Sequence, residues 1–158
     1  MKKIVGYTTG CFDMFHIGHL NLLRAAKEKC DYLIAGVNTD ELVLSYKNKI
    51  PVIPFEERIK IVEAIEFVDK AVPVTERDKF AAWQKYKFDV CFVGDDWKGS
   101  EIFNETEKKL ALVGVRMEYL PYTKGISSTI LRKKINGDCM KNYTRGGGEW
   151  RWCNLKRA

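Results

Sequence analysis

The two histidines of the chain lie three residues apart, in the segment His16-Ile17-Gly18-His19. At this spacing both imidazoles lie on the same side of one helical turn, and the glycine between them carries no side chain that could block a ligand. The pair follows an apolar run and begins a stretch of helical periodicity, where free backbone amides and the positive helix end attract anions. We therefore expect His16 and His19 to donate hydrogen bonds to phosphate, and we predict that both are catalytic.

The residues before the histidines allow other chemistries. Cys11, His16 and His19 could bind zinc, with Asp13 as a fourth ligand, but the close spacing of Cys11 and His16 and the lack of another ligand pair argue against it. A hydrolase with a serine or cysteine nucleophile is disfavoured, because no G-x-S-x-G segment accompanies the histidines. We interpret Thr8-Thr9-Gly10 as a flexible turn whose outward amides add to the anion site.

Apolar runs that alternate with helical patterns must position these residues. We predict strands at 3–7, 32–37, 71–74, 90–93 and 115–120, and helices at 18–29, 55–66, 79–86, 101–112 and 128–135. Parallel strands need such crossover helices. The pattern therefore predicts a doubly wound α/β domain with a five-stranded parallel sheet, whose ligands bind at the carboxyl ends of the strands.

The length and charge of the chain limit its organisation and its partners. At 158 residues it has room for one domain, which we place at residues 1–137. Residues 138–158 form a basic tail of unknown role, with five basic and two acidic residues. The net charge of +6 divides equally between domain and tail, which is too mild for a polyanion surface. A small phosphorylated ligand, and not nucleic acid, is the predicted partner.

The location of the protein is predicted from what the sequence lacks. No apolar stretch approaches the roughly 20 residues of a membrane span, so we expect no membrane insertion. No signal-peptide pattern follows the first lysines, and the five cysteines are scattered without a C-x-x-C pair. We expect a cytoplasmic protein without disulfides or structural zinc.

Several segments resemble a known enzyme family in order and spacing. Residues 10–19 resemble the H-x-G-H signature of the nucleotidyltransferase superfamily. Residues 94–97, Gly-Asp-Asp-Trp, and residues 123–129 resemble two segments of the glycerol-3-phosphate cytidylyltransferases, and residues 38–41 with Glu57-Arg58 match further landmarks. The likeness covers residues 3 to 136. It implies a Rossmann-like fold and a homodimer.

The resemblance also implies a reaction. A phosphate monoester attacks the α-phosphorus of CTP, pyrophosphate leaves, and a CDP-alcohol forms, with Mg²⁺ as cofactor and glycerol 3-phosphate as the expected acceptor. Phosphoethanolamine or phosphocholine is an alternative acceptor, and adenylyl transfer from ATP an alternative reaction. A protein of another class, a catalytically silent module that binds a nucleotide or a metal, is the remaining alternative.

The family pattern assigns roles to further residues. Lys47 joins the histidines as a catalytic residue, and Lys47, Arg58 and Lys79 are assigned to the acceptor phosphate. Arg58 lies where the helix dipole disfavours a cation, so a bound phosphate would explain it. Nucleotide binding is assigned to Thr9, Gly10, Cys11, Phe12, Asp13, Gly18, Lys49, Asp95, Tyr122, Thr123, Gly125, Ile126, Ser127, Ser128 and Thr129.

Some residues depart from the pattern or have several interpretations. Tyr122 stands where the family has arginine, which replaces a bidentate cation with a single hydroxyl, and Cys11 replaces a threonine. The carboxylates of Asp13 and Asp95 could orient a histidine, a substrate hydroxyl or Mg²⁺-bound waters, or could simply cap the backbone. Trp97 is expected to pack in the core and is given no role.

Overall fold

Five parallel strands form one sheet in the computed structural model, which describes residues 2–137. In chain order they are β1 (Val5–Gly10), β2 (Tyr32–Asn38), β3 (Lys70–Val74), β4 (Val90–Gly94) and β5 (Arg116–Leu120). The order in the sheet is β3-β2-β1-β4-β5, so β1 and β4 are neighbours from which the chain proceeds in opposite directions. Ligands bind at such a switch point in open α/β sheets. The predicted doubly wound fold is confirmed.

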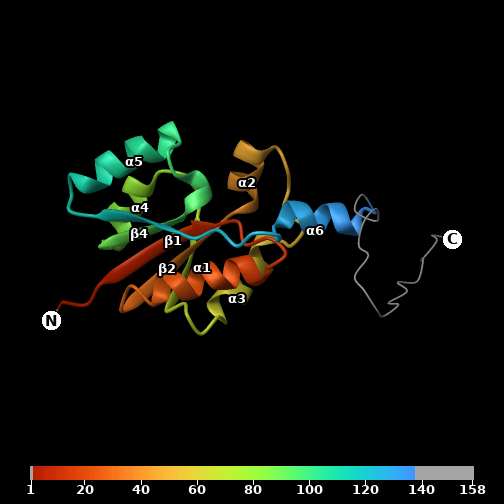
Figure 1. Cartoon of the computed structure of the whole chain (residues 1–158), viewed down its shortest axis with the longest axis horizontal. Coiled ribbons are helices and arrows are strands. Elements are labelled where there is room, and N and C mark those ends of the chain that lie inside the picture. Colours follow the sequence, from red (N-terminus) through yellow and green to blue (C-terminus); the bar gives the residue numbers. More distant parts are fainter. Residues whose placement is uncertain (1, 138–158) are drawn as a thin grey trace.

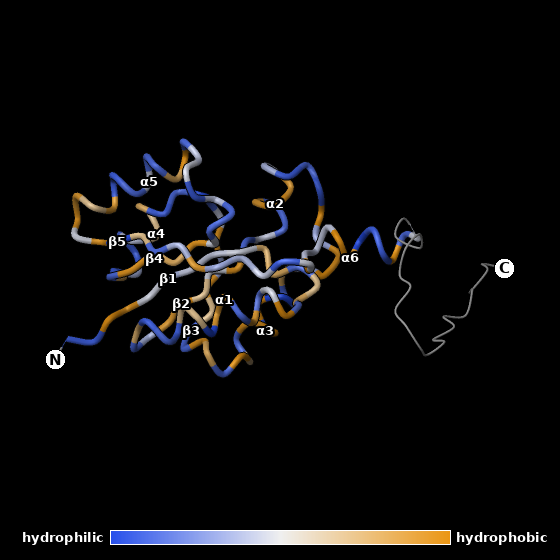
Figure 2. Tube along the Cα trace, viewed as in Figure 1, coloured by the Kyte–Doolittle hydropathy of each residue, from blue (hydrophilic) through white to orange (hydrophobic). Residues whose placement is uncertain are grey.

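Helices cover both faces of the sheet (Figure 1). On one face lie α1 (Ile17–Lys27) and α3 (Phe55–Glu63), and on the other lie α4 (Lys79–Tyr86) and α5 (Glu101–Ala111). Each face has its own core: Leu23 and Val62 are buried in the first, and Tyr7 and Leu110 in the second. Apolar residues accordingly run along the strands and recur at intervals on the helices (Figure 2).

The sequence pattern missed one helix, α2 (Asp40–Lys47). The hydroxyl of Thr39 accepts a hydrogen bond from the amide of Leu42, and Asn48 ends the helix in a left-handed conformation. The Thr-Asp-Glu start was a readable capping signal. Lys47 therefore lies in the last turn of a helix.

The boundaries of the other elements agree closely with the prediction, with one difference that concerns the site. Strand β1 extends to Gly10, and Thr8, Thr9 and Gly10 pair with Ala35, Gly36 and Val37 of β2. The predicted turn at Thr8-Thr9-Gly10 is therefore wrong, because these residues continue the strand ladder. The loop that leads to the histidines begins at Cys11.

The last helix, α6 (Ser128–Ile135), extends away from the sheet (Figure 1). The predicted basic tail at 138–158 lies outside the described residues. Among the helices described, none has both the length and the apolar character that crossing a membrane requires.

Candidate active site

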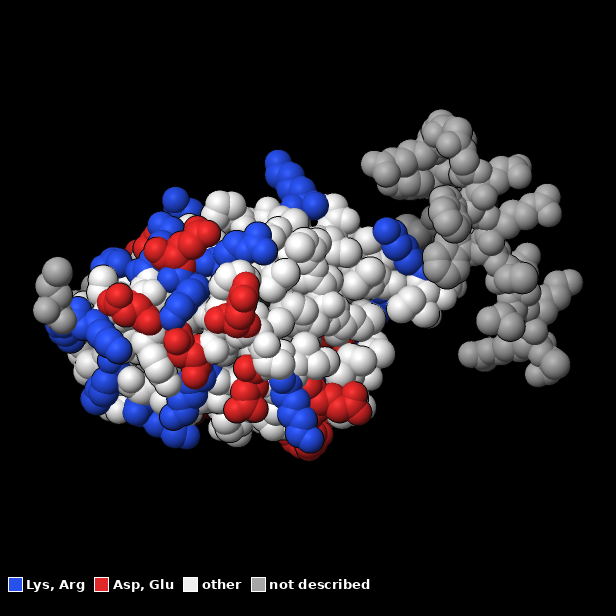
Figure 3. Space-filling view, turned by 90° about the horizontal axis from the view of Figure 1, so that it is seen from below, with Lys and Arg blue, Asp and Glu red and all other residues white. Residues whose placement is uncertain are grey.

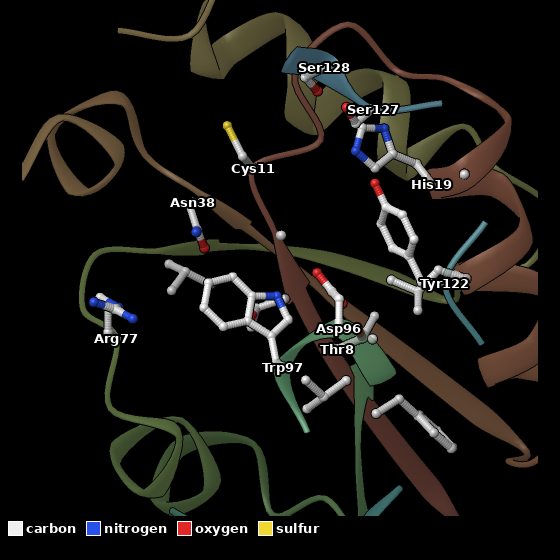
Figure 4. A pocket seen from close by; sticks show the side chains of 18 of the residues that line it. Thr8, Cys11, His19, Asn38, Arg77, Asp96, Trp97, Tyr122, Ser127 and Ser128 are labelled. Carbon is white, nitrogen blue, oxygen red and sulfur yellow. The ribbon is translucent and has the colours of Figure 1, made fainter. Parts of the chain in front are cut away.

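A cavity of about 420 Å³ opens at the carboxyl ends of the strands, around the switch point between β1 and β4. Most of the residues singled out in the sequence line it: Thr9, Gly10, Cys11, His16, Gly18, His19, Lys47, Lys79, Tyr122, Thr123, Ser127, Ser128 and Thr129. They come from β1, α1, α2, α4 and the segment that leads into α6. The fold thus gathers distant parts of the chain around one space (Figure 4).

The two histidines are fixed by the start of α1. The amide of Gly18 donates to Nδ1 of His16 at 3.1 Å, and the amide of His16 donates to Nδ1 of His19 at 3.3 Å, which forms a reciprocal capping box. The rings stack with their centroids 3.8 Å apart. Because each Nδ1 accepts a backbone hydrogen bond, the proton of each neutral ring is on Nε2. Both rings therefore keep one N–H donor for a ligand.

The surroundings keep these imidazoles uncharged at neutral pH. Burial lowers the pKa of His16, and burial together with the neighbouring His16 lowers the pKa of His19 to about 3. Neutral imidazoles can donate hydrogen bonds to phosphate oxygens, but they contribute no net charge. The cationic side chains that line the cavity are Lys47, Arg77 and Lys79 among the described residues.

The start of α6 faces the same end of the cavity. The hydroxyl of Ser127 caps the helix by accepting from the amide of Ile130 at 3.1 Å. The hydroxyl of Ser128 donates to the carbonyl of Asp13 at 2.8 Å, which ties this helix to the loop after β1. Figure 4 shows His19, Ser127 and Ser128 together at one end of the cavity. Two helix N-termini, of α1 and α6, thus favour negative charge there.

Replacement of Gly18 with alanine tests this geometry. A Cβ at Gly18 would lie 2.9 Å from Cε1 of His16, closer than Cβ atoms approach other heavy atoms, and 3.0 Å from Nδ1, at the tight end of observed contacts. We expect Gly18→Ala to displace the His16 ring, to cost about 1 kcal/mol of stability through the weakened cap, and to lower kcat by about tenfold or more. Thermal unfolding and steady-state kinetics measure the two effects. Unchanged kcat would show that the His16 ring has no required position.

Asp13 supports the site from outside the cavity. Its buried carboxylate accepts hydrogen bonds from the amides of Val52 and Ile53 at 3.0 and 2.9 Å and pairs with Arg132 at 2.5 Å. Burial alone would raise the pKa of Asp13, but the two amides and Arg132 together lower it. The carboxylate has no room for a ligand. The assignment of its side chain to nucleotide binding, or to Mg²⁺, is therefore corrected to a positioning role.

Arg58 differs from the sequence interpretation in the same way. Its side chain is completely buried and does not line the cavity. The guanidinium donates to the carbonyls of Ile53 and Cys11 and pairs with the carboxylate of Asp40 at 2.6 Å. These partners explain a cation in the first turn of α3 without a bound phosphate. The predicted acceptor contact is wrong, and Arg58 instead joins the loops after β1 and α2.

Other assigned residues also lie outside the cavity lining. Phe12 is buried in the core, and its backbone has a φ of 51°, in the left-handed region. The carboxylate of Asp95 accepts from the amide of Tyr122 at 2.9 Å, while its neighbour Asp96 lines the cavity. The remaining residues assigned to the ligand but outside the lining are Lys49, Gly125 and Ile126. Their roles in binding stay predictions without a place in the observed pocket.

The structure adds side chains to which the sequence analysis gave no role. Thr8 lines the cavity with a buried hydroxyl that has no hydrogen-bond partner among residues 2–137, so a ligand would satisfy it. Asn38 lies at the end of β2, where side chains in such folds meet ligands. Trp97 contacts Phe103 but is 45% exposed and lines the cavity, so packing is only part of its role. Thr8 and Asn38 could have been found from the sequence by their positions near the carboxyl ends of predicted strands.

No group of three or more histidine, cysteine or acidic side chains suited to a metal ion occurs within residues 2–137. Cys11, His16 and His19 all line the cavity. Both imidazole Nδ1 atoms accept backbone hydrogen bonds, and the Asp13 carboxylate is fully used. The arrangement is suited to binding phosphate oxygens.

Comparison with known proteins supports this interpretation of the site. Residues 7–134 match the family model described as Cytidylyltransferase-like. The chain is 40% identical over 136 residues to a glycerol-3-phosphate cytidylyltransferase of Bacillus spizizenii, a match that covers 85% of this chain and 98% of that protein. It is 38% identical over 123 residues to the ethanolamine-phosphate cytidylyltransferase of Mus musculus, which covers 77% of this chain and 30% of that protein.

A solved structure extends the similarity to three dimensions. The fold resembles that of a lipopolysaccharide core biosynthesis protein from Thermoplasma volcanium with a TM-score of 0.67 and 26% sequence identity, over 79% of this chain and 100% of that one. The family match spans both halves of the sheet and every residue that lines the cavity. The chain therefore belongs to the cytidylyltransferase-like family.

Proposed function

We propose that this protein transfers CMP from CTP to glycerol 3-phosphate, which forms CDP-glycerol and releases pyrophosphate. The observation that carries the proposal is the convergence of two neutral imidazoles and two helix N-termini on one cavity that also holds Lys47 and Lys79. Glycerol-3-phosphate cytidylyltransferases of three bacteria are 34–40% identical to this chain over 85–87% of its length, which supports the choice of substrates.

The chemistry needs no nucleophile from the protein. An oxygen of the acceptor phosphate, already anionic at neutral pH, forms a bond to the α-phosphorus of CTP. The bond from that phosphorus to the bridging oxygen breaks, and its electron pair leaves with pyrophosphate. Catalysis then requires in-line alignment and stabilisation of charge on the phosphate oxygens. The Nε2–H groups of His16 and His19 would donate to oxygens whose charge increases as pyrophosphate leaves.

The two ends of the cavity suggest where each substrate lies. His19, Ser127 and Ser128 form one end, which suits the triphosphate (Figure 4). Lys47 lines the same cavity as His19, and its charge is among the causes that lower the pKa of that imidazole. We place Lys47 between the two substrates, where a point charge can contact phosphates of both. Lys79 is the first residue of α4, and we place it at the end of the cavity that binds the acceptor.

The residues present fit Mg²⁺ only as an ion that arrives with the nucleotide. The carboxylate of Asp13 is used by the backbone and Arg132, and that of Asp95 by the amide of Tyr122. Mg²⁺ usually keeps several waters and binds through one or two carboxylates and the phosphates of a substrate. Asp96 is a carboxylate in the lining that could contact such an ion or its waters.

Phosphoethanolamine is the second candidate acceptor. The carboxylates of Glu76 and Asp96 line the cavity and could bind an ammonium group. Ethanolamine-phosphate cytidylyltransferases of mouse and Arabidopsis thaliana are 38% and 34% identical to this chain. Glycerol 3-phosphate is preferred because its cytidylyltransferases match over nearly their whole length.

A screen of nucleotides and acceptors tests the proposal. We expect CTP, glycerol 3-phosphate and Mg²⁺ to yield pyrophosphate and CDP-glycerol, and we expect chelation of Mg²⁺ to stop the reaction, because the metal screens the phosphate charges. The measurement is pyrophosphate release, with CTP and ATP each paired with glycerol 3-phosphate, phosphoethanolamine and phosphocholine. Turnover with ATP alone would overturn the choice of nucleotide, and no turnover with any pair would overturn the enzymatic function.

The assembly and the location of the protein stay predictions. A homodimer is expected from the family resemblance, and Ile50, Val52 and Ile135 are large apolar residues exposed by more than half, as they are in many subunit contacts. Basic and acidic side chains are mixed over one face of the domain (Figure 3). That mixture is in line with a small anionic substrate and not with a nucleic-acid surface. A cytoplasmic location remains an expectation from the sequence.

A further inference from the structure

Arg77 lies outside every motif that led to the site, in the connection between β3 and α4. Its exposed side chain lines the cavity, and it is the one arginine in that lining among residues 2–137. The guanidinium forms no hydrogen bond or ion pair with another residue in this range, whereas the guanidinium groups of Arg58 and Arg132 are held by Asp40 and Asp13. Arg77 therefore presents unused N–H donors to the cavity.

The ring of Tyr46 supports this guanidinium. The central carbon of the Arg77 guanidinium lies 4.7 Å from the ring centroid of Tyr46, in a cation–π contact between α2 and the β3–α4 connection. The phenol is held in turn, because the amide nitrogen of Asn38 donates to its hydroxyl at 3.0 Å. Stacking on an aromatic face leaves the N–H edge of a guanidinium free to bind an anion in two contacts.

A second cation lies at the same end of the cavity. The ammonium of Lys79 lies 4.9 Å from the ring centroid of Phe103 and has no ion pair among the described residues. Burial lowers the pKa of Lys79, and the nearby charge of Arg77 lowers it further. The carboxylate of Asp78 instead accepts the amide of Phe80 at the start of α4. The charge of Asp78 offsets this effect in part, but neither Arg77 nor Lys79 forms an ion pair with a carboxylate among residues 2–137. Two like charges without an ion-pair partner favour an anion between them.

We propose that Arg77 binds the phosphate of the acceptor through its free N–H edge, and that Tyr46 is a positioning residue that holds the guanidinium in place. The inference rests on the proposed cytidylyl transfer and adds a specificity-determining residue to it. Arg77 and His19 lie on opposite sides of the cavity in Figure 4, which is why the acceptor phosphate, and not the triphosphate at the histidine end, is assigned to Arg77.

Steady-state kinetics of Arg77 variants of the full chain test the assignment. We expect Arg77→Gln to raise KM for glycerol 3-phosphate by about 10-fold to 100-fold, the loss typical of a charge-assisted hydrogen bond, while KM for CTP changes by less than about threefold. Arg77→Lys should recover part of the loss, since it keeps the charge but not the planar fork. The matched control is Arg24→Gln, which removes a guanidinium stacked on Phe67 outside the cavity.

Variants of Tyr46 distinguish a positioning role of its aromatic ring from a purely structural role of the residue. Tyr46→Leu removes the aromatic face and should raise the acceptor KM by about threefold to tenfold with little change in kcat. Tyr46→Phe keeps the face, loses only the hydroxyl, and should keep KM close to the wild-type value. Equal loss in both variants would show that the hydroxyl and not the ring matters, and would overturn the positioning role.

Further results would test the assignment of Arg77 and the proposed function separately. An unchanged acceptor KM in Arg77→Gln, or an equal rise of KM for CTP, overturns the assignment of Arg77. If the wild type does not turn over CTP, the proposed function fails, and thermal unfolding with glycerol 3-phosphate decides about Arg77 separately. Stabilisation of the wild type and Arg24→Gln but not of Arg77→Gln supports the phosphate site, and equal stabilisation or none overturns it.

Discussion

Replacement of His19 with alanine is expected to lower kcat with CTP and glycerol 3-phosphate by about 10²-fold to 10³-fold, the usual effect of losing one preorganised donor. Because the amide of His16 occupies Nδ1, the Nε2–H of His19 is left for the phosphate that we propose binds there. Since this donor acts most strongly as pyrophosphate leaves, kcat should fall more than KM for CTP rises. Pyrophosphate release under saturating substrates measures the effect.

The same substitution also removes a helix cap, which must be separated from the chemical effect. Loss of the bond from the amide of His16 should cost about 1 kcal/mol, so His19→Ala should remain folded at assay temperature. Thr39→Ala is the matched control, because it removes the cap of α2 and its hydroxyl does not line the cavity. A His19→Ala protein that is folded and as active as the control would contradict a catalytic role for the imidazole.

Replacement of Arg58 with methionine is expected to destabilise the protein by about 3 to 5 kcal/mol, the cost of breaking a buried ion pair. The substitution leaves the carbonyls of Ile53 and Cys11 without their donor and removes the countercharge of Asp40. Buried polar groups without partners account for much of this cost. Denaturant unfolding measures it, and a shift of the midpoint with an unchanged slope would identify a loss of stability.

A neighbouring residue supplies the control for Arg58. Lys60 is exposed on the same helix, so Lys60→Met removes a positive charge from α3 without breaking a buried contact and should change stability by less than about 0.5 kcal/mol. If Arg58→Met were as stable as the wild type but raised KM for the acceptor, the structural role would be wrong. Arg58 would then contact substrate, as the sequence first indicated.

The sequence predicted most of the helices and strands because these elements depend on neighbours along the chain. The bounds of α4 and α6 were predicted correctly from the apolar periodicity of the sequence. The two histidines were recognised because three residues of spacing bring both rings over one turn. Segment α2 was missed because its apolar face is short, although Thr39 gave a usable capping signal.

Contacts between segments far apart in the chain could not be predicted from the sequence in this way. Asp13 and Arg58 had the residue types of ligand-binding groups, and only the folded chain shows that other residues saturate them. The partners of Asp13 are 39, 40 and 119 positions away, and those of Arg58 are 5, 18 and 47 positions away. Arg77 belongs to no motif. In the folded chain α2 approaches the β3–α4 connection, which stacks the guanidinium of Arg77 on the ring of Tyr46 and leaves its N–H donors free. A sequence determines which groups a chain contains and which local turns they form. Whether a charge meets another residue or faces an open cavity depends on tertiary packing, because burial and hydrogen-bond partners come from segments that are far apart in the chain.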